Sequence, residues 1–489
     1  VLTNAGQGAD ALESIGLART AELLTNTIGL AVTTAVTALV LGVASAWLVT
    51  RTDLGGRPIW TVLVALPIVF PSYVGALALL GAFGPAGVVN DWLGTSIPKP
   101  TGVVGAWLAL SLFNAPYVFL LSAVALRRMD RSLEEAARGL GLGPREVFQR
   151  VVLPQLRPTL AASALLVALY AVADFGAVSF MGFDTFTRAI YSRFRIGDVE
   201  SAVAIAAVLV LITVALLLLV RDARKTVGPA SARSGKEPVV VPLGRPARVA
   251  ANTFLGLLVA ASVALPAAVL VTWTVRGSSA SWSGLLPAAF GSLGVSALAG
   301  GAAVVVALPV ALLVVRYPNR WSGGLDRVQW GLYSLPHLAV ALALLVFALR
   351  VSRPVYQTTA LLVLAFVTMF LPQATGAVAD GLHGVSPRLE ESARSLGRGP
   401  AGAFTSVTLP MIRPQLATGA LLVFLTSVKE LPATLLLRPT GLDTHSVRIW
   451  AATEEGLLGR ASAAALVLLA VSAIPMFLLS TRDLRVSNR

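Results

Sequence analysis

The chain has 489 residues, of which 56% are hydrophobic and only 13% are charged, and its mean hydropathy is +0.79. Because soluble domains carry about 25% charged residues, this composition excludes a mainly soluble enzyme, a disordered chain and a coiled coil. The 38 basic and 24 acidic residues give a net charge of +14, which basic cytoplasmic loops of a membrane protein explain without a nucleic-acid partner. The chain has no cysteine, so disulfides, thiolate nucleophiles and cysteine metal sites are excluded.

About eleven apolar segments follow one another along the chain, each near the length of about 20 residues that a membrane-spanning helix needs. Lipid offers no partner to an unpaired backbone group, so such runs form helices. The sequence therefore predicts an all-α integral membrane protein with about eleven transmembrane helices. Their expected ranges are residues 27–49, 59–80, 103–125, 160–180, 202–220, 254–274, 293–315, 332–349, 358–376, 416–437 and 463–479.

Basic residues set the expected orientation, because Lys and Arg accumulate in cytoplasmic loops. The stretch from Arg221 to Arg248 holds seven basic and two acidic residues with interspersed Pro and Gly, which is typical of a cytoplasmic linker. This orientation places Val1 outside and Arg489 inside, as an odd number of spans requires.

An internal repeat predicts the domain organisation. Glu135-Ala136-Ala137 recurs as Glu391-Ser392-Ala393 at an offset of 256, and Arg51 recurs as Arg316 at an offset of 265. We expect a first half over residues 1–220, a linker over 221–249 and a second half over 250–489. The span at 254–274 has no counterpart in the first half, which predicts an ancestral plan of six plus six helices with the first helix absent here or preceding the chain.

Each half carries one conspicuous loop between two spans. In the first copy, Glu134-Glu135-Ala136-Ala137-Arg138 is a strong helix former, Gly141 suits a helix end with positive φ, and Pro144 suits the first turn of the next helix. That second helix runs into Leu153-Pro154. The second copy has the same order of features, and its corresponding residues are Glu390, Glu391, Ala393, Gly397, Pro400 and Pro410.

This spacing resembles the cytoplasmic loop of permease subunits in binding-protein-dependent ABC importers. The resemblance implies that each loop docks on an ATP-hydrolysing subunit, so that this chain serves two copies of an ABC ATPase and receives its cargo from a solute-binding protein. The coupling residues that it implies are Glu134, Glu135, Ala136, Ala137, Gly141, Pro154, Glu390, Glu391, Ala393, Gly397 and Pro410. The location implied is the bacterial plasma membrane.

The chain is not expected to be an enzyme or to hold a cofactor, because its one Gly-Lys pair, Gly235-Lys236, is followed by Glu237 and does not fit a phosphate-binding loop. ATP and Mg²⁺ therefore belong to the partner ATPase. The alternative interpretation of the two loops, as amphipathic linkers without a partner, does not explain why Gly-x-Gly-Pro and Leu-Pro recur at fixed offsets.

Two acidic residues fall inside predicted spans, Asp174 in the first half and Glu430 at the equivalent position of the second. A carboxylate there is costly to insert, so it is either functional or paired. Gly176 and Pro432 lie two residues further on and indicate opened helices. The acids either cap freed backbone N–H groups, pair with a base such as Lys429, or line the transport pathway.

The strings around these acids, residues 174–191 and 429–441, resemble ferric-iron permeases, as does the fusion of two halves in one chain. No metal site is predicted in the chain, since His337, His383 and His445 are too far apart in the predicted topology to share one ion. For Tyr73 and Tyr117 the sequence leaves open whether they face a cavity or anchor the helices at the membrane interface.

Three alternatives remain at this stage. The same importer class with another small solute, such as thiamine or a phosphonate, keeps the ATPase partner. The second alternative is an ion-coupled secondary transporter, in which Asp174 and Glu430 bind the driving cation. The third is a membrane scaffold that transports nothing. Neither of these two needs the repeated loop.

Overall fold

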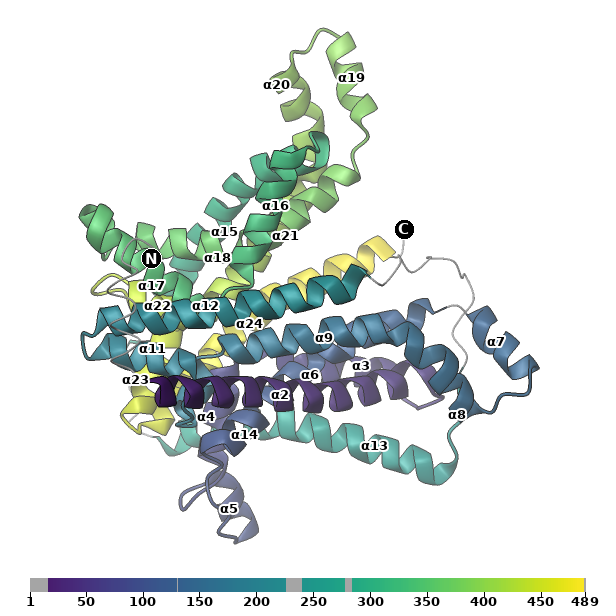
Figure 1. Cartoon of the computed structure of the whole chain (residues 1–489), viewed down its shortest axis with the longest axis vertical. Helices are drawn as coiled ribbons and strands as arrows, with labels where there is room; N and C mark the ends of the chain where they lie inside the picture. The colour runs from purple at the N-terminus through teal and green to yellow at the C-terminus, as the bar shows by residue number, and fades with distance from the viewer. Residues whose placement is uncertain (1–15, 130, 226–239, 278–283, 488–489) are drawn as a thin grey trace. The chain divides into compact units, whose positions relative to one another are not determined.

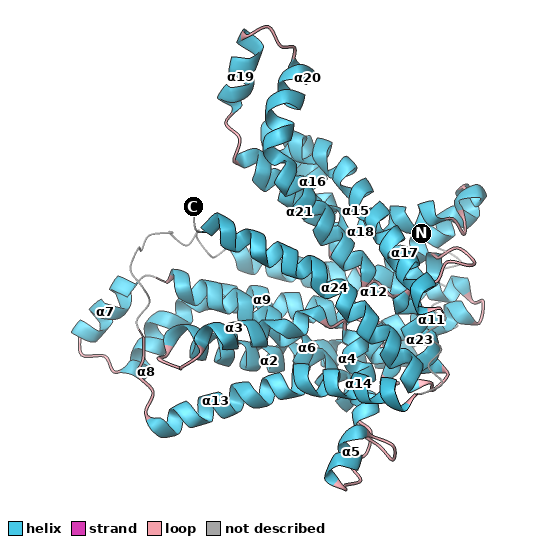
Figure 2. Cartoon of the chain, turned by 180° about the vertical axis from the view of Figure 1, so that it is seen from behind, coloured by secondary structure: helices cyan, strands magenta, loops and turns pink. Residues whose placement is uncertain are grey.

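The computed structural model describes residues 16–129, 131–225, 240–277 and 284–487. These residues fold almost entirely into helices, with one isolated β-bridge and no strand among them, as Figure 2 shows. The chain divides into two compact units, Val1–Ser278 and Ser279–Arg489, and each is described by itself.

Among the described residues, the first unit contains five helical stretches of 20 or more residues, counting α13–η4–α14 as one, and a set of shorter elements, most of which are labelled in Figure 1. In chain order they are α2 (Leu17–Arg51), α3 (Arg57–Ala65), η2 (Leu66–Val69), α4 (Ser72–Ala82), α5 (Val88–Leu93), α6 (Gly102–Arg128), α7 (Arg131–Gly139), α8 (Pro144–Val147), η3 (Phe148–Val152), α9 (Leu153–Ala173), α10 (Gly176–Phe180), α11 (Phe186–Arg195), α12 (Val199–Lys225), α13 (Arg245–Val259), η4 (Ala260–Ala264) and α14 (Leu265–Arg276), where α13, η4 and α14 run on as one long helix.

The second unit repeats this order from α2 onward. Its elements are α15 (Leu285–Arg316), α16 (Arg320–Tyr333), α17 (His337–Val351), η5 (Arg353–Val355), α18 (Thr359–His383), α19 (Pro387–Ser395), α20 (Pro400–Ala403), η6 (Phe404–Thr408), α21 (Leu409–Val428), α22 (Pro432–Leu437), α23 (His445–Glu454) and α24 (Leu458–Ser487). The internal repeat seen in the sequence is therefore a repeat of helices.

The all-α membrane fold is confirmed, but the count of eleven spans is not. Eight helices among the described residues are long and apolar enough to cross a membrane, and ten result if two bent pairs each count as one span. The bent pairs are α3–η2 with α4, at 96°, and α16 with α17, at 106°. Each bend precedes a proline, Pro71 or Pro336, whose missing N–H and restricted neighbour end the first helix. Within α24, the segment Leu458–Ala473 is apolar but shorter than the eight long helices.

Small residues allow the long helices to pack closely within each unit. Gly42 of α2 lies against α6, where an added Cβ would lie 2.6 Å from the Cβ of Val118. In the second unit, an added Cβ on Gly300 of α15 would lie 2.6 Å from the backbone oxygen of Ala420 in α21. Small side chains are the usual means of close helix packing in membranes, where no hydrophobic effect drives helices together.

The helix formed by α13, η4 and α14 packs within the first unit, although the repeat assigned it to the second half. Trp60 Nε1 in α3 donates to Asn252 Oδ1 at 3.2 Å, and Trp273 Nε1 in α14 donates to the backbone oxygen of Gly81 at 2.8 Å. Arg276 also forms a 2.8 Å ion pair with Asp91. The compact units therefore divide at residue 278, downstream of the expected linker.

The end of the expected linker is attached to the end of α2. Val241 N–H donates to the oxygen of Arg51 at 2.8 Å, Asp53 N–H donates to the oxygen of Val241 at 3.3 Å, and Arg248 pairs with Asp53 at 3.0 Å. Residues 226–239, the centre of that linker, lie outside the described residues.

Three five-residue π-helical segments, η3, η4 and η6, each lead directly into a Leu-Pro pair. In η3, Leu153 N–H reaches back five residues to the oxygen of Phe148, and in η6 Leu409 N–H does the same to Phe404. A proline inside a helix lacks the N–H donor and collides with the carbonyl four residues before it. A wider π turn relieves that collision, so the helix continues through Pro154 and Pro410 without breaking.

Candidate functional site

The two repeated loops form the same structure in each unit. Helix α7 ends at Gly139, two residues before Gly141, which has a φ of +86°. Helix α19 ends at Ser395, two residues before Gly397, which has a φ of +88°. In the first loop, Leu142 N–H donates to the oxygen of Ala137 at 3.2 Å, and in the second Arg398 N–H donates to that of Ala393 at 3.2 Å. This six-to-one bond closes a helix end that requires glycine. The predicted glycine turns are confirmed, and the following helices begin at Pro144 and Pro400 as expected.

The first loop presents different residues inward and outward. Glu134 and Ala137 are buried, and the Glu134 carboxylate pairs with Arg51 at 2.7 Å. Glu135 and Ala136 are exposed. Leu140, beside the glycine turn, is 83% exposed.

The second loop repeats this division. Ala393 is buried and Glu391 is exposed, while Leu396, the equivalent of Leu140, is 84% exposed. Glu390 is half-buried, lies 3.7 Å from Arg316 and accepts a hydrogen bond from Thr408. In each unit the loop helices lie at one end of the long helices, as Figure 1 shows. An exposed leucine beside the glycine turn therefore recurs at the equivalent position of both loops.

Asp174 lies where α9 ends and α10 begins. Its Oδ1 accepts hydrogen bonds from Ala177 N–H at 3.0 Å and Val178 N–H at 3.2 Å, and its Oδ2 accepts one from the hydroxyl of Ser72 in α4. Asp174 thus caps the short helix after the break and ties it to the bend of the α3–α4 pair.

Glu430 occupies the equivalent break between α21 and α22. Its Oε1 accepts from Ala433 N–H at 3.2 Å, and its Oε2 lies 3.0 Å from Nδ1 of His337 at the start of α17. His337 is the repeat equivalent of Ser72 at an offset of 265. Sequence reasoning missed this pair because it treated the histidines as isolated residues. The offsets match His337 to Ser72 and Glu430 to Asp174, but only the structure brings the members of each pair into contact.

Tyr73 is buried, and its Cβ would lie 2.6 Å from a Cβ added to Gly176, so it packs against the helix break. Tyr117 stacks on Tyr170 with ring centroids 5.0 Å apart. Among the described residues, no three His, Asp or Glu side chains lie close enough together to hold a metal ion.

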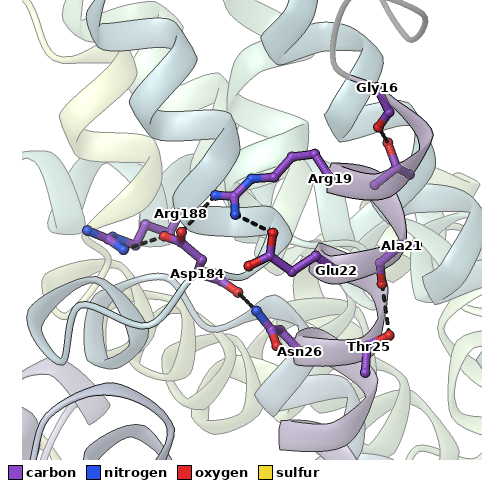
Figure 3. A network of polar contacts seen from close by, with 9 residues as sticks. Gly16, Arg19, Ala21, Glu22, Thr25, Asn26, Asp184 and Arg188 are labelled. Atoms are coloured by element: carbon purple, nitrogen blue, oxygen red, sulfur yellow. Dashed lines mark hydrogen bonds and ion pairs between the residues drawn. The ribbon is translucent and has the colours of Figure 1, made fainter.

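A charged network fastens the start of α2 to the segment before α11 (Figure 3). Arg19 Nη2 lies 2.7 Å from Asp184 Oδ2, Asn26 donates to the backbone oxygen of Asp184 at 2.9 Å, and Arg188 pairs with the same carboxylate. Partial burial opposes ionisation of Asp184, but Arg19 and Arg188 outweigh it and lower the pKa of this carboxyl.

Two repeated bundles of apolar helices, each with a glycine-hinged loop outside the spans, define a transport permease of the multi-pass membrane class. The chain belongs to the family of binding-protein-dependent transport system inner membrane components, whose model matches residues 8–225 and 302–487.

Its relatives include permeases for several cargoes. The chain is 30% identical over 479 residues to the Fe(3+)-transport system permease protein FbpB 2 of Haemophilus influenzae, covering 96% of this chain and 91% of that protein. It is 34% identical over 175 residues to the molybdenum transport system permease protein ModB of Mycobacterium tuberculosis, covering 34% of this chain and 65% of the relative. The putrescine transport system permease protein PotI of Escherichia coli is 31% identical over 138 residues, covering 28% and 47%.

Proposed function

We propose that this chain is the membrane permease of an ATP-driven importer for ferric iron, with the ions delivered by a solute-binding protein on the outer side. The observation that carries the importer assignment is the pair of equivalent loops, each with an exposed leucine beside a glycine turn. The iron assignment is supported by the similarity to the Fe(3+)-transport permease, which extends over nearly the whole of both chains. The molybdenum and putrescine permeases match about a third of this chain.

In the proposed mechanism, ATP is hydrolysed on two copies of a partner ATPase, which grip α7 and α19 on the cytoplasmic side. The linker and the C-terminus lie on the same side. Movement of each loop passes into α9 or α21 through the π-helical segment, because the helix is continuous from Pro144 to Ala173 in the first unit and from Pro400 to Val428 in the second. The roles of Glu135, Gly141, Glu391 and Gly397 in docking, and of Asp174 and Glu430 along the pathway, belong to this proposal.

The test is uptake by the chain reconstituted with its ATPase and binding protein in liposomes. We expect ATP-dependent uptake of labelled Fe(III), and no uptake of labelled thiamine, molybdate or putrescine. Glu135→Arg and Gly141→Pro are expected to leave membrane insertion intact while uptake and binding of the ATPase are lost. Uptake of Fe(III) without ATP, driven by an ion gradient, would instead support a secondary transporter. Preference for another solute would overturn the iron assignment alone.

A further inference from the structure

Five positions around the helix break of the first unit have equivalents in the second unit, and the residues at most of these positions differ in chemistry between the units. The first unit has Ile68, Ser72, Tyr117, Tyr170 and Asp174, and the second unit has Tyr333, His337, Gln373, Thr426 and Glu430 at the matching offsets of 265 and 256. Only the acid is similar in the two sets. The other four positions change in polarity, size or both.

In the second unit these side chains form two hydrogen-bonded groups. Gln373 Nε2 of α18 donates to the hydroxyl of Tyr333 at 3.2 Å, and the hydroxyl of Thr426 in α21 donates to Gln373 Oε1 at 2.9 Å. His337 and Glu430 form the second group at 3.0 Å. Tyr333 and His337 flank the 106° bend between α16 and α17, and Thr426 lies one helical turn before Glu430 at the end of α21.

In the first unit the same positions carry side chains that make other contacts. Tyr117 and Tyr170 stack face to face, where Gln373 and Thr426 exchange a hydrogen bond in the second unit. Ile68 stands in place of Tyr333. The serine–aspartate contact replaces the histidine–glutamate contact. Equivalent positions therefore contact one another in both units, but the side chains that make these contacts differ in chemistry.

The location of these groups argues for contact with cargo. Gln373 lies near the middle of α18, a candidate membrane span, where a polar side chain faces the protein interior or water and not lipid. The four side chains are half-buried, so part of their surface stays exposed although they form hydrogen bonds; they are Tyr333, His337, Gln373 and Thr426. In secondary transporters, broken membrane helices commonly form the substrate site.

We propose that Tyr333, His337, Gln373 and Thr426 form a cargo-contact site in the second unit, with Glu430 as a positioning residue that holds His337. This proposal rests on the proposed function and names the residues that handle the cargo. Hydroxyl and amide oxygens suit a hard cation or its coordinated water. Neutral donors also hold such an ion more weakly than carboxylates do, which favours release during transport.

The experiment compares Tyr333→Phe and the double variant Gln373→Leu/Thr426→Val with the matched first-unit variant Tyr170→Phe, which keeps the aromatic stack. Each is reconstituted with the ATPase and the binding protein, and Fe(III) uptake, ATP hydrolysis and the amount of inserted permease are measured. We expect the double variant to lose about tenfold in Fe(III) uptake with ATP hydrolysis and insertion unchanged, because oxygen contacts to the cation or its coordinated water are removed. Tyr333→Phe should lose a smaller factor, and Tyr170→Phe should behave as the wild type.

Two outcomes overturn the site. The first is Fe(III) uptake at the wild-type level in the double variant. The second is a loss of uptake in Tyr333→Phe that is matched by an equal loss of inserted protein, because that pattern shows a role in helix packing. If the wild-type protein carries another solute, the proposed iron function fails by itself. The same variants are then measured on that solute, and unchanged uptake overturns the contact site.

Discussion

Arg51, the last residue of α2, forms a buried ion pair with Glu134 of α7. Its Nη1 lies 2.7 Å from Glu134 Oε1, and the two side chains are 1% and 5% exposed. The equivalent pair of the second unit, Arg316 with Glu390, is longer at 3.7 Å and more exposed, at 16% and 30%. The first loop is thus anchored to two long helices, by a charge pair to α2 and by the continuous chain to α9. Glu134 faces this anchor, whereas Glu135 is on the exposed side.

Removing one partner of the Arg51–Glu134 pair is expected to destabilise the first unit by about 3–5 kcal/mol, because it leaves an unpaired buried charge. Arg51→Met should therefore accumulate poorly and unfold at lower temperature. The double variant Arg51→Met/Glu134→Leu should recover most of that stability, since both charges are gone. Thermal unfolding of the purified proteins measures both effects.

The second unit supplies the control for the ion pair. Arg316→Met is expected to cost less than Arg51→Met, because Arg316 is farther from its acid and Glu390 keeps the hydroxyl of Thr408 as a partner. Equal losses in the two variants would contradict the idea that burial of the pair decides its contribution.

The glycine turn of the first loop gives a second prediction. Gly141→Ala should destabilise the loop by about 1 kcal/mol, because a Cβ is unfavourable at a φ of +86°. Gly139→Ala is the matched control, since Gly139 is the last residue of α7, has no positive φ, and has open space where its Cβ would lie. Binding of the ATPase should weaken in Gly141→Ala and stay unchanged in Gly139→Ala. A similar fall in both would show that glycine flexibility, and not the turn geometry, matters.

The loops were predictable from sequence because their signals are local. Gly141 and Gly397 stand where a helix must end, and Pro144 and Pro400 begin the next helix, so no tertiary information was needed. The opened helices at Asp174 and Glu430 were likewise indicated by Gly176 and Pro432. The capping of α10 and α22 by these two acids was one of the alternatives named.

Other features depend on packing between distant segments. The partner of Glu430 is His337, 93 residues away, and hydropathy cannot pair them. The α13–α14 helix packs in the first unit through Trp60 and Trp273, although the sequence repeat places it with the second half. The 96° and 106° bends interrupt two expected spans, 59–80 and 332–349, that a hydropathy profile reads as straight. The expected span 463–479 overlaps the shorter apolar helix Leu458–Ala473, so these three segments separate the eight long helices from the expected eleven.

His445 provides a prediction on stability and pH. It is fully buried at the start of α23, and neither ring nitrogen has a hydrogen-bond partner among the described residues. Burial, and secondarily the charge of Arg448, lower the pKa of His445 to about 4, with Asp443 acting in the opposite direction. Phe186 occupies the equivalent place in the first unit, and the N–H groups of Phe186 and His445 bond the hydroxyls of Thr27 and Ser292.

The folded protein keeps His445 neutral. As the pH falls from about 6.5 to about 4, the unfolded chain therefore binds a proton that the folded chain does not bind. The free energy of unfolding should therefore decrease over this range, by up to about 1.4 kcal/mol per pH unit. His445→Phe should remove this dependence and raise stability at neutral pH, since an unsatisfied buried polar group is lost. Denaturation followed at pH 7.5 and 5 tests both; a variant as pH-sensitive as the wild type would assign the effect to other groups.

The exposed leucines of the two loops give the last prediction. Leu140 and Leu396 are 83% and 84% exposed, so replacing either with Ser should change the free energy of unfolding by no more than about 0.5 kcal/mol. If an ATPase subunit buries each of them, the same change should weaken its binding by about 1.5–3 kcal/mol, the value of burying a leucine side chain. Titration of the ATPase onto permease in nanodiscs measures this, with Leu93→Ser as the control, because Leu93 is 64% exposed in α5 and outside both loops. Loss of affinity in the loop variants alone supports docking at α7 and α19. Unchanged affinity in the variant replaced at both leucines would mean that the ATPase binds elsewhere.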